Sequence, residues 1–365
     1  MTSVKPITRV IVEKDAYLYP QSGDILKKCK GLPVQDADED STQYSNMEMG
    51  MDKTTLRIMP HKGDFLKPCP GTNGYICCGY MILHVGTNCP MDCSYCILQA
   101  YFNQPSLRLF INLESELNNI GKFIENHPKR IFRIGTGEFT DSLALDHITG
   151  WSTTLLEFFK DRRNCVLELK TKTDKIDNLL ISPYRDRVII SWSLNSHEVA
   201  TREEHGAPSI KKRILAAKRC QEEGYVVGFH FDPLIHYSGW EKDYLRSLEL
   251  MDHYIDPKGV IWISLGCLRY MPVLKTIIRK RHPGTEILNG EFVRGMDGKM
   301  RYFKPIRMDI YSFMREQIEK WEKEIGLYLC MESDEIWRKS FGWSPGHSKG
   351  LSNYLDKRVQ ILFKN

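Results

Sequence analysis

Apolar runs typical of β-strands alternate with helical segments through the middle of the chain. Between the runs lie segments whose apolar residues recur every three to four positions, as in 113–126 and 210–223, which is the pattern of amphipathic helices. Strands and helices that alternate in units of about 30 residues form parallel βαβ units. The sequence therefore predicts an α/β fold built on six parallel strands. The six runs begin at Met81, Arg130, Cys165, Val188, Val226 and Val260.

A loop with three cysteines follows the first of these strands. Cys89, Cys93 and Cys96 lie in the stretch GTNCPMDCSYCILQ, directly after the apolar run 80–85. Loops at the carboxyl ends of strands are where α/β barrels keep their chemistry. Thiolates hold iron–sulfur clusters, and a cubane has four irons to ligate, so three close cysteines leave one iron open for catalysis.

Zinc is the competing interpretation of the same three cysteines. Three closely spaced cysteines can belong to a structural zinc site, and the chain would then be a zinc-stabilised nucleic-acid-binding module. Such sites usually show paired Cys-x2-Cys arms or a fourth Cys or His ligand at short range, and the loop has neither. The iron–sulfur interpretation is therefore favoured.

The cysteine loop resembles that of the radical S-adenosylmethionine enzymes. The shared features are the Cys-x3-Cys-x2-Cys spacing and an aromatic residue, Tyr95, before the last cysteine. The resemblance implies a [4Fe–4S] cluster at Cys89, Cys93 and Cys96, whose open iron binds S-adenosylmethionine and cleaves it to a 5′-deoxyadenosyl radical. It also implies a partial (βα)6 TIM-like barrel, open rather than closed by eight strands.

A longer resemblance, over about residues 80 to 320, is to the spore photoproduct lyase family. That family splits a cross-linked thymine dimer in DNA, so the resemblance implies a nucleic-acid or nucleotide-like substrate and an electron donor such as flavodoxin or ferredoxin. The segments that are similar in order and spacing are DHITG (146–150), LKTK (169–172), SLNS (193–196), GYVVGF (224–229) and SGWE (238–241).

Several strand-end residues are candidates for binding S-adenosylmethionine. The segment Gly135, Thr136, Gly137 and Glu138 follows the second strand and resembles the glycine-rich segment that binds the methionine amino group in these enzymes. Glycines let backbone approach a ligand, and a carboxylate accepts a charge-assisted hydrogen bond from an ammonium group. By position, the resemblance adds five cofactor-lining residues: Tyr95, Thr140, Lys172, Ser193 and Asp232.

Two departures from the family leave the hydrogen-atom donor open. The family's donor cysteine corresponds to Glu138, and its tyrosine after the last cluster cysteine corresponds to Ile97. Tyr95 and Cys330 are the candidate catalytic residues, with Cys267 as a further possible donor. The missing cysteine also supports an alternative substrate, a peptide or a small molecule.

Three further cysteines, Cys69, Cys77 and Cys78, lie just before the first strand. Together with Cys267 or Cys330 they are candidates for an auxiliary cluster. The alternative is that adjacent Cys77 and Cys78 point to opposite sides of an extended segment and cannot share one metal ion.

The segment 291–303 is predicted to form a hairpin with Asp297 and Gly298 in a type I′ turn. Cations interleaved with aromatic residues on a protruding hairpin can contact nucleic acid, although such hairpins are also common as solvated edges. The residues concerned are Arg294, Lys299, Arg301 and Lys304, with Phe292, Tyr302 and Phe303.

Composition indicates the class of protein, its location and its possible partners. The chain has 365 residues, 42% hydrophobic and 27% charged, and no run approaches the roughly 18 apolar residues of a membrane span. We expect a cytoplasmic protein without membrane contact, because eleven cysteines and no signal-peptide pattern fit a reducing compartment, with anaerobic conditions suiting a cluster. A net charge of +5 permits a nucleic-acid partner. The expected domains are an N-terminal extension (1–79), the barrel (80–270) and a C-terminal extension with hairpin, helix and aromatic tail (271–365).

Overall fold

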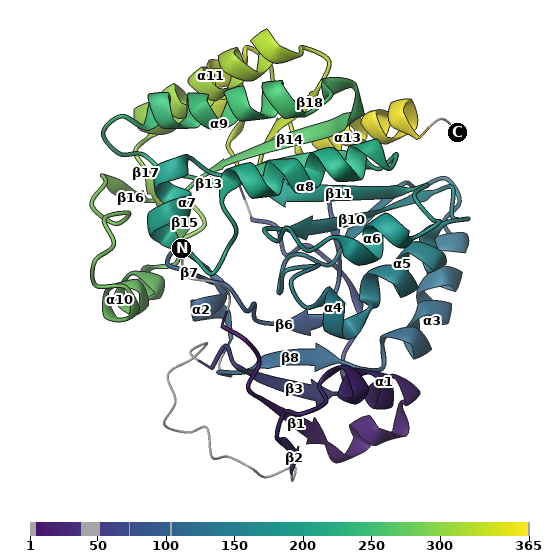
Figure 1. Cartoon of the computed structure of the whole chain (residues 1–365). Coiled ribbons are helices and arrows are strands. Elements are labelled where there is room, and N and C mark those ends of the chain that lie inside the picture. The colour runs from purple at the N-terminus through teal and green to yellow at the C-terminus, as the bar shows by residue number, and fades with distance from the viewer. Residues whose placement is uncertain (1–4, 38–51, 73, 103, 364–365) are drawn as a thin grey trace.

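Two β-sheets organise the chain, and the three-cysteine loop lies where they meet (Figure 1). The structure is a computed structural model that describes residues 5–37, 52–72, 74–102 and 104–363. An eight-stranded sheet forms the core, and a five-stranded sheet lies beside it at the lower end of Figure 1. Within the described residues, no helix is both long enough and apolar enough to span a bilayer.

The eight-stranded sheet contains the six predicted strands in sequence order and one extra strand at each edge. Neighbouring strands are parallel except at one edge, where β4 runs antiparallel to β5. The prediction of a partial barrel of six parallel strands is confirmed. In sheet order the strands are β18 (Gly326–Leu329), β14 (Val260–Cys267), β13 (Val226–Leu234), β11 (Val188–Ser193), β10 (Cys165–Thr171), β9 (Phe132–Gly135), β5 (Met81–Leu83) and β4 (Leu66–Pro68).

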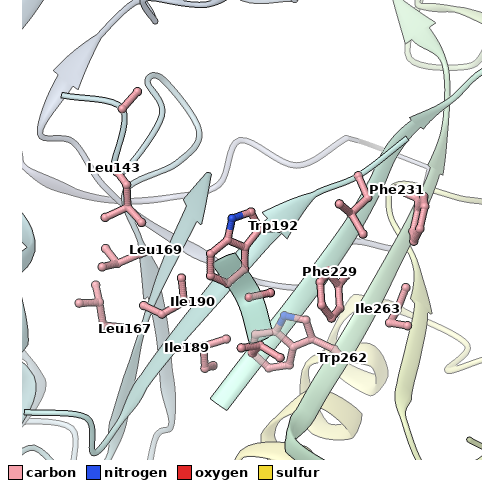
Figure 2. Packing of buried hydrophobic residues seen from close by; sticks show 14 of the residues in the cluster. Leu143, Leu167, Leu169, Ile189, Ile190, Trp192, Phe229, Phe231, Trp262 and Ile263 are labelled. Carbon is pink, nitrogen blue, oxygen red and sulfur yellow. The ribbon is translucent and has the colours of Figure 1, made fainter. Parts of the chain in front are cut away.

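Helices cover the outer face of this sheet, and the apolar layer between them is the main core. Residues alternate between the two faces of a strand, so β11 buries Ile190 and Trp192 on the outside while Ser193 faces the barrel interior. Figure 2 shows part of this layer, with Trp192 near the middle of the view and Phe229 and Phe231 toward its right side. The covering helices are α3 (Leu113–Glu125), α5 (Trp151–Phe159), α6 (Asp177–Ile181), α8 (Ile210–Glu222), α9 (Trp240–Tyr254) and α11 (Lys304–Trp321), with the short α4 (Asp146–Thr149) and α7 (His197–Glu203).

The aromatic tail packs back on the barrel, as its composition predicts. It forms α12 (Asp334–Phe341), which buries Trp337 completely, and α13 (Ser348–Leu362). Arg133 of β9 donates to Asp356 of α13 at 2.9 Å, while Arg358 of the same helix donates to the carbonyl of Ile261 in β14 at 3.2 Å. The helix α13 thus joins strands from the two halves of the sheet, which requires the sheet to curl.

The five-stranded sheet combines N-terminal strands with strands that flank the cysteine loop. Both β6 and β8 come from the segment predicted as barrel, so the proposed boundary at residue 79 is crossed by a continuous sheet. In order, its strands are β2 (Val34–Ala37), β1 (Arg9–Glu13), β3 (Thr55–Met59), β8 (Leu107–Phe110) and β6 (Gly86–Thr87), and α1 (Pro20–Lys28) connects β1 to β2.

The predicted hairpin is present as β16 (Phe292–Arg294) and β17 (Met300–Tyr302), and β15 (Arg269–Tyr270) pairs with β17 as a third strand. The predicted type I′ turn is wrong. That turn needs a positive φ at both central residues, whereas Gly298 has φ 74° and Asp297 is not in the left-handed region. The N–H of Gly298 donates to the carbonyl of Gly295 at 2.9 Å.

Candidate active site

A cavity of about 410 Å³ opens at the carboxyl ends of the barrel strands. It brings together eleven of the thirteen predicted cluster, cofactor and catalytic residues. Gly135 and Thr136 do not line it, and neither does Cys267. The eleven residues are Cys89, Cys93, Tyr95, Cys96, Gly137, Glu138, Thr140, Lys172, Ser193, Asp232 and Cys330.

The cysteine loop is held by the N-terminal sheet at its start. Asn88 adopts φ 70°, a left-handed conformation that asparagine tolerates better than most residues. Its Oδ1 accepts from Lys53 Nζ at 2.6 Å and from the Cys89 N–H at 2.9 Å, while Lys53 also donates to the carbonyl of Cys89 at 2.8 Å. The first cluster cysteine is therefore fixed by a lysine that enters the loop from outside the barrel.

The middle of the loop is held by the segment that follows the fourth barrel strand. The short strand β7 (Asp92–Cys93) pairs with β12 (Glu204–His205), and the Ser94 N–H donates to the carbonyl of Glu203 at 2.8 Å. The short helix α2 (Leu98–Tyr101) then leads away from the third cysteine. Backbone pairing on both sides thus orients the three thiols toward the cavity.

The thiols suit a multi-iron cluster. Burial raises the pKa of Cys89 to about 12 and that of Cys93 well above its ordinary value, so these side chains need an adjacent positive charge to become thiolates, which bound metal provides. Among the described residues, no three Cys, His, Asp or Glu side chains converge closely enough to hold a single metal ion. A cubane carries its irons at separate corners, and three thiols around a cavity fit that demand.

Tyr95 stands between the cluster loop and a buried charge network. Its hydroxyl donates to Glu204, whose carboxylate also pairs with Arg213 and lies 3.8 Å from Lys172 Nζ. Burial, followed by the charge of Glu204, raises the pKa of Tyr95 well above its ordinary value. The phenol therefore stays protonated and fixed, and the same network holds Lys172 at the cavity wall.

The predicted glycine-rich segment divides into two parts with different roles. A Cβ on Gly135 would lie 1.6 Å from Tyr80 Oη and 2.6 Å from the Glu168 carbonyl oxygen, so this glycine is required for packing inside the barrel. Thr136 is buried and donates to Ser142 Oγ at 2.7 Å. Neither residue lines the cavity that Gly137 and Glu138 reach, so the contact of Gly135 and Thr136 with the cofactor stays a prediction.

Glu138 is engaged in an ion pair that the sequence did not predict. Lys170 Nζ lies 2.8 Å from Glu138 Oε1 and 5.4 Å from the centroid of the Tyr80 ring. Burial opposes the charge on Lys170, but Glu138 outweighs it and raises the pKa of Lys170 well above its ordinary value. Strand alternation could have suggested Lys170, since it lies two residues before Lys172 on the same face of β10.

A buried polar group forms the floor of the cavity, and sequence reasoning missed it. Glu168 Oε1 accepts from Trp262 Nε1 at 3.0 Å, contacts His230 Nε2 at 2.9 Å and accepts from the Ser191 hydroxyl. Burial would raise the pKa of Glu168, but His230 and the hydrogen bonds dominate and lower it to about 2. This group could have been found from the sequence, because polar residues occupy inward-facing positions of strands that are otherwise apolar.

Cys330 also lines the cavity, next to another charged pair. Arg269 binds Asp232 through both terminal nitrogens, at 3.1 and 2.9 Å, and its Nη2 lies 3.5 Å from Cys330 Sγ. Burial raises the pKa of Cys330 well above its ordinary value although Arg269 acts in the opposite direction. The cavity therefore contains a neutral thiol beside a fixed guanidinium group.

The candidate auxiliary cysteines also line this cavity. Cys69, Cys77 and Cys78 are all among its lining residues. Burial raises the pKa of Cys69 to about 12 and that of Cys78 above its ordinary value. With Cys330 they place four further thiols around the space that the cluster loop borders.

The hairpin does not present its cations as a protruding basic surface. Arg301 is buried, lies 2.7 Å from Asp297 and packs 4.0 Å from the centroid of the Tyr75 ring. Lys304 pairs with Glu335, and Lys299 turns into the cavity. The tertiary structure therefore uses Arg301 internally and turns Lys299 toward the site, while Arg294 and Lys304 remain exposed.

A curled, mostly parallel sheet with three cysteine thiols and polar strand ends around one cavity defines an enzyme of the radical S-adenosylmethionine class, and a lyase within that class. The spore photoproduct lyase family model matches residues 77–327, and the chain belongs to this family.

Three curated relatives, all named spore photoproduct lyase, match the chain. The protein of Geobacillus sp. (strain Y412MC61) is 25% identical over 251 residues, which cover 67% of this chain and 72% of that protein. The protein of Bacillus subtilis (strain 168) is 26% identical over 237 residues, covering 64% and 67%. The protein of Clostridium acetobutylicum is 24% identical over 305 residues, covering 81% and 86%.

Solved structures of spore photoproduct lyase have the same fold. One variant with dinucleoside spore photoproduct superposes with a TM-score of 0.77 at 22% identity, covering 90% of this chain and 99% of that one. A second variant, with bound AdoMet and dinucleoside spore photoproduct, gives a TM-score of 0.75 at 22% identity, covering 89% and 98%.

Proposed function

We propose that the chain uses radical chemistry to repair or modify a cross-linked lesion in nucleic acid. The observation that carries the proposal is the shared cavity, in which cluster thiols, candidate cofactor ligands and the thiol of Cys330 face one space. The names of the relatives and the dinucleoside spore photoproduct bound to a similar fold support a DNA lesion as the substrate. All eleven cysteines are free, which suits a reducing, cytoplasmic setting.

In this proposal Cys89, Cys93 and Cys96 hold a [4Fe–4S] cluster, and S-adenosylmethionine binds beside it. When bound and reduced, the cluster cleaves S-adenosylmethionine and supplies a 5′-deoxyadenosyl radical, which takes a hydrogen atom from the substrate. The chain contributes a closed environment for this chemistry. Met91 and Leu98, both buried, form apolar parts of the wall that keep water from the reacting atoms.

Polar strand ends provide the groups that would bind S-adenosylmethionine. Glu138 accepts from the methionine ammonium group, because its pair with Lys170 leaves further lone pairs on the carboxylate. Lys172 offers a cation to the methionine carboxylate, and Ser193 and Asp232 offer hydrogen bonds to the ribose hydroxyls. Thr140 and Tyr95 complete the walls of this binding site.

Cys330 is the proposed hydrogen-atom donor. A carboxylate held in an ion pair with Lys170 has no O–H to give, so Glu138 does not replace the cysteine that the family has at this position. The thiol of Cys330 is kept neutral by burial and faces the cavity, so its S–H bond can break homolytically while a C–H bond forms on the substrate radical. Tyr95 is the second candidate, since its phenolic O–H is also protonated and lines the cavity.

A peptide or small-molecule substrate is the second candidate function. The observation that favours it is the pairing of the buried Arg301 with Asp297 and of the exposed Lys304 with Glu335, which leaves the hairpin less basic than its sequence indicates. The two functions differ in their dependence on salt, because phosphate contacts weaken steeply as salt concentration rises.

The test uses protein reconstituted anaerobically with iron and sulfide, S-adenosylmethionine and dithionite. We expect formation of 5′-deoxyadenosine, and with dinucleoside spore photoproduct we expect conversion to thymine monomers. Deuterium placed at the abstracted position should appear in 5′-deoxyadenosine. A protein that contains about one zinc and no iron, and makes no 5′-deoxyadenosine, would refute the proposal. Cleavage of S-adenosylmethionine without any conversion of the lesion would leave the second candidate as the function.

A further inference from the structure

A helix beside the cysteine loop carries four cations and no anion. It is α10 (Pro272–Arg281), with the sequence PVLKTIIRKR. The cations are Lys275, Arg279, Lys280 and Arg281. In a chain with 51 basic and 46 acidic residues, a helix of this length without any acid is a local concentration of positive charge.

One face of α10 attaches the helix to the cluster loop. Leu274 and Ile278 are completely buried, and Arg281 continues the same stripe at positions i, i+4 and i+7. Arg281 Nη2 donates to Asp92 Oδ1 at 2.7 Å, and its Nη1 donates to Gln99. Asp92 lies one residue before Cys93, so α10 is fixed directly against the loop that carries the thiols.

The opposite face of α10 is open and mixes cations with apolar side chains. Arg279 and Lys280 are exposed and Lys275 is half-buried, and within the described part of the chain Lys275 and Arg279 make no ion pair. Met271, just before the helix, is 40% exposed, and Val273 is 53% exposed. Aliphatic groups surrounded by cations are typical of an interface with a protein rather than of a purely solvated face.

A groove lies beside α10. Its volume is about 790 Å³, and it lies between α7 and the segment after α10. Four carboxylate residues line it, and Arg202 in the same groove pairs with two of them, Glu198 and Glu286. No residue of α10 lines the catalytic cavity, so a substrate can reach the cavity without covering this helix.

We infer that the open face of α10 docks an acidic one-electron carrier protein that reduces the cluster. The inference rests on the proposed function, because only a redox-active cluster needs such a partner. The carrier loses one electron and the cluster gains it, going from the 2+ to the 1+ state, and no proton moves. Charge complementarity supports the assignment, since opposite charges steer association and place the partner over the loop that holds the thiols.

Nucleic acid is the other polyanion that a basic helix can bind. The exposed Met271 and Val273 favour a protein, because a phosphate backbone gains nothing from aliphatic groups. The position of α10 outside the cavity also favours a carrier, since a carrier must approach the cluster while the substrate occupies the cavity.

The experiment compares a charge-reversed face with a matched control. The variant carries Lys275→Glu and Arg279→Glu, and the control carries Lys211→Glu and Lys212→Glu, two exposed cations of α8. Binding of oxidised flavodoxin and of an acidic ferredoxin is measured by titration. Formation of 5′-deoxyadenosine is then measured with each reduced carrier and, separately, with dithionite.

We expect the α10 variant to bind carriers at least tenfold more weakly and to lose carrier-driven activity in proportion, while dithionite-driven activity and the control variant stay unchanged. Raising the salt concentration should reduce the difference. Unchanged carrier binding, or no binding by the unaltered protein, would overturn the inference. A loss of oligonucleotide binding without a loss of carrier binding would assign the face to nucleic acid instead. If the unaltered protein makes no 5′-deoxyadenosine even with dithionite, the proposed function itself fails.

Discussion

Lys170 Nζ lies 2.8 Å from Glu138 Oε1, on the cavity wall that follows the second barrel strand. The pair places a carboxylate and its counterion at the position where the resemblance to the spore photoproduct lyase family leads one to expect a hydrogen-donating cysteine. We propose that Glu138 recognises charge on the cofactor and that Cys330 returns the hydrogen atom.

Replacement of Glu138 by glutamine tests charge recognition. We expect Glu138→Gln to weaken S-adenosylmethionine binding about tenfold, because a neutral amide accepts a weaker hydrogen bond from an ammonium group. Calorimetric titration of the reconstituted protein measures the dissociation constant. The matched control is Glu335→Gln, which removes an exposed carboxylate paired with Lys304. An unchanged dissociation constant would mean that the Glu138 carboxylate serves only as the counterion of Lys170 and does not bind the ammonium group.

Removal of the Cys330 thiol tests the hydrogen donor. We expect Cys330→Ala to retain 5′-deoxyadenosine formation but to lower product formation at least tenfold, because the substrate radical then lacks a nearby S–H bond. Product analysis by chromatography and mass spectrometry separates the two steps. Adding Glu138→Cys to this variant should restore part of the product at saturating S-adenosylmethionine, because it returns a thiol to the cavity although it removes the carboxylate proposed to bind the ammonium group. Full product formation by Cys330→Ala would move the role to Tyr95.

Iron analysis tests the assignment of the seven cavity cysteines. We expect about four irons per chain after anaerobic reconstitution, since a cubane contains four. Cys93→Ala should lose most of the iron and the brown colour. Cys78→Ala should keep the iron and the colour, because Cys78 is not one of the three proposed cluster ligands. If the unaltered protein bound about eight irons and Cys78→Ala about four, an auxiliary cluster at Cys69, Cys77 and Cys78 would be established.

The acid stability of the protein should depend on Glu168. Its pKa is lowered to about 2 in the folded chain, so the carboxylate adds stability above its unfolded pKa near 4.3 and loses that contribution as the pH falls toward 2. The full effect is about 3 kcal/mol. Urea unfolding at several pH values should therefore show a smaller loss of stability between pH 5 and 2 for Glu168→Gln. A pH dependence equal to that of the unaltered chain would contradict the assignment.

Gly135 should be required for stability rather than for cofactor binding. We expect Gly135→Ala to lower the free energy of unfolding by about 3 kcal/mol, because the new Cβ would overlap Tyr80 Oη and approach the Glu168 carbonyl. Thermal unfolding followed by circular dichroism measures the change. Tyr80→Phe in the same chain should recover part of it, since one of the two obstructing atoms is removed. A loss of S-adenosylmethionine binding with unchanged stability would return Gly135 to the cofactor site.

The order of strands and the positions at their ends were predictable from sequence. The apolar runs identified the six inner strands, and the rule that parallel strands end on one side brought Lys172 and Ser193 to the cysteine loop, whereas Asp232 was named by the family resemblance. The edge strands β4 and β18 were not predicted.

The pairing of side chains was not predictable. Lys170, Glu168 and Arg269 occur in ordinary strand sequences, and their partners lie on other strands, so their roles emerge only when the sheet curls. The partners of the hairpin cations were not predictable for the same reason. Its sequence shows four cations, but the side chain that neutralises Arg301, that of Asp297, reveals its role only through the geometry of the turn.

The contact between Lys53 and Asn88 makes the cysteine loop depend on a residue that precedes the family match. The family match begins at residue 77, yet Lys53, which holds the proposed iron ligand Cys89, comes from the segment ahead of it. A shortened chain that starts at the match would retain every proposed ligand and still lose the brace that holds their loop. We therefore expect such a chain to assemble its metal centre poorly, so the amino-terminal segment acts as a built-in scaffold for cofactor maturation.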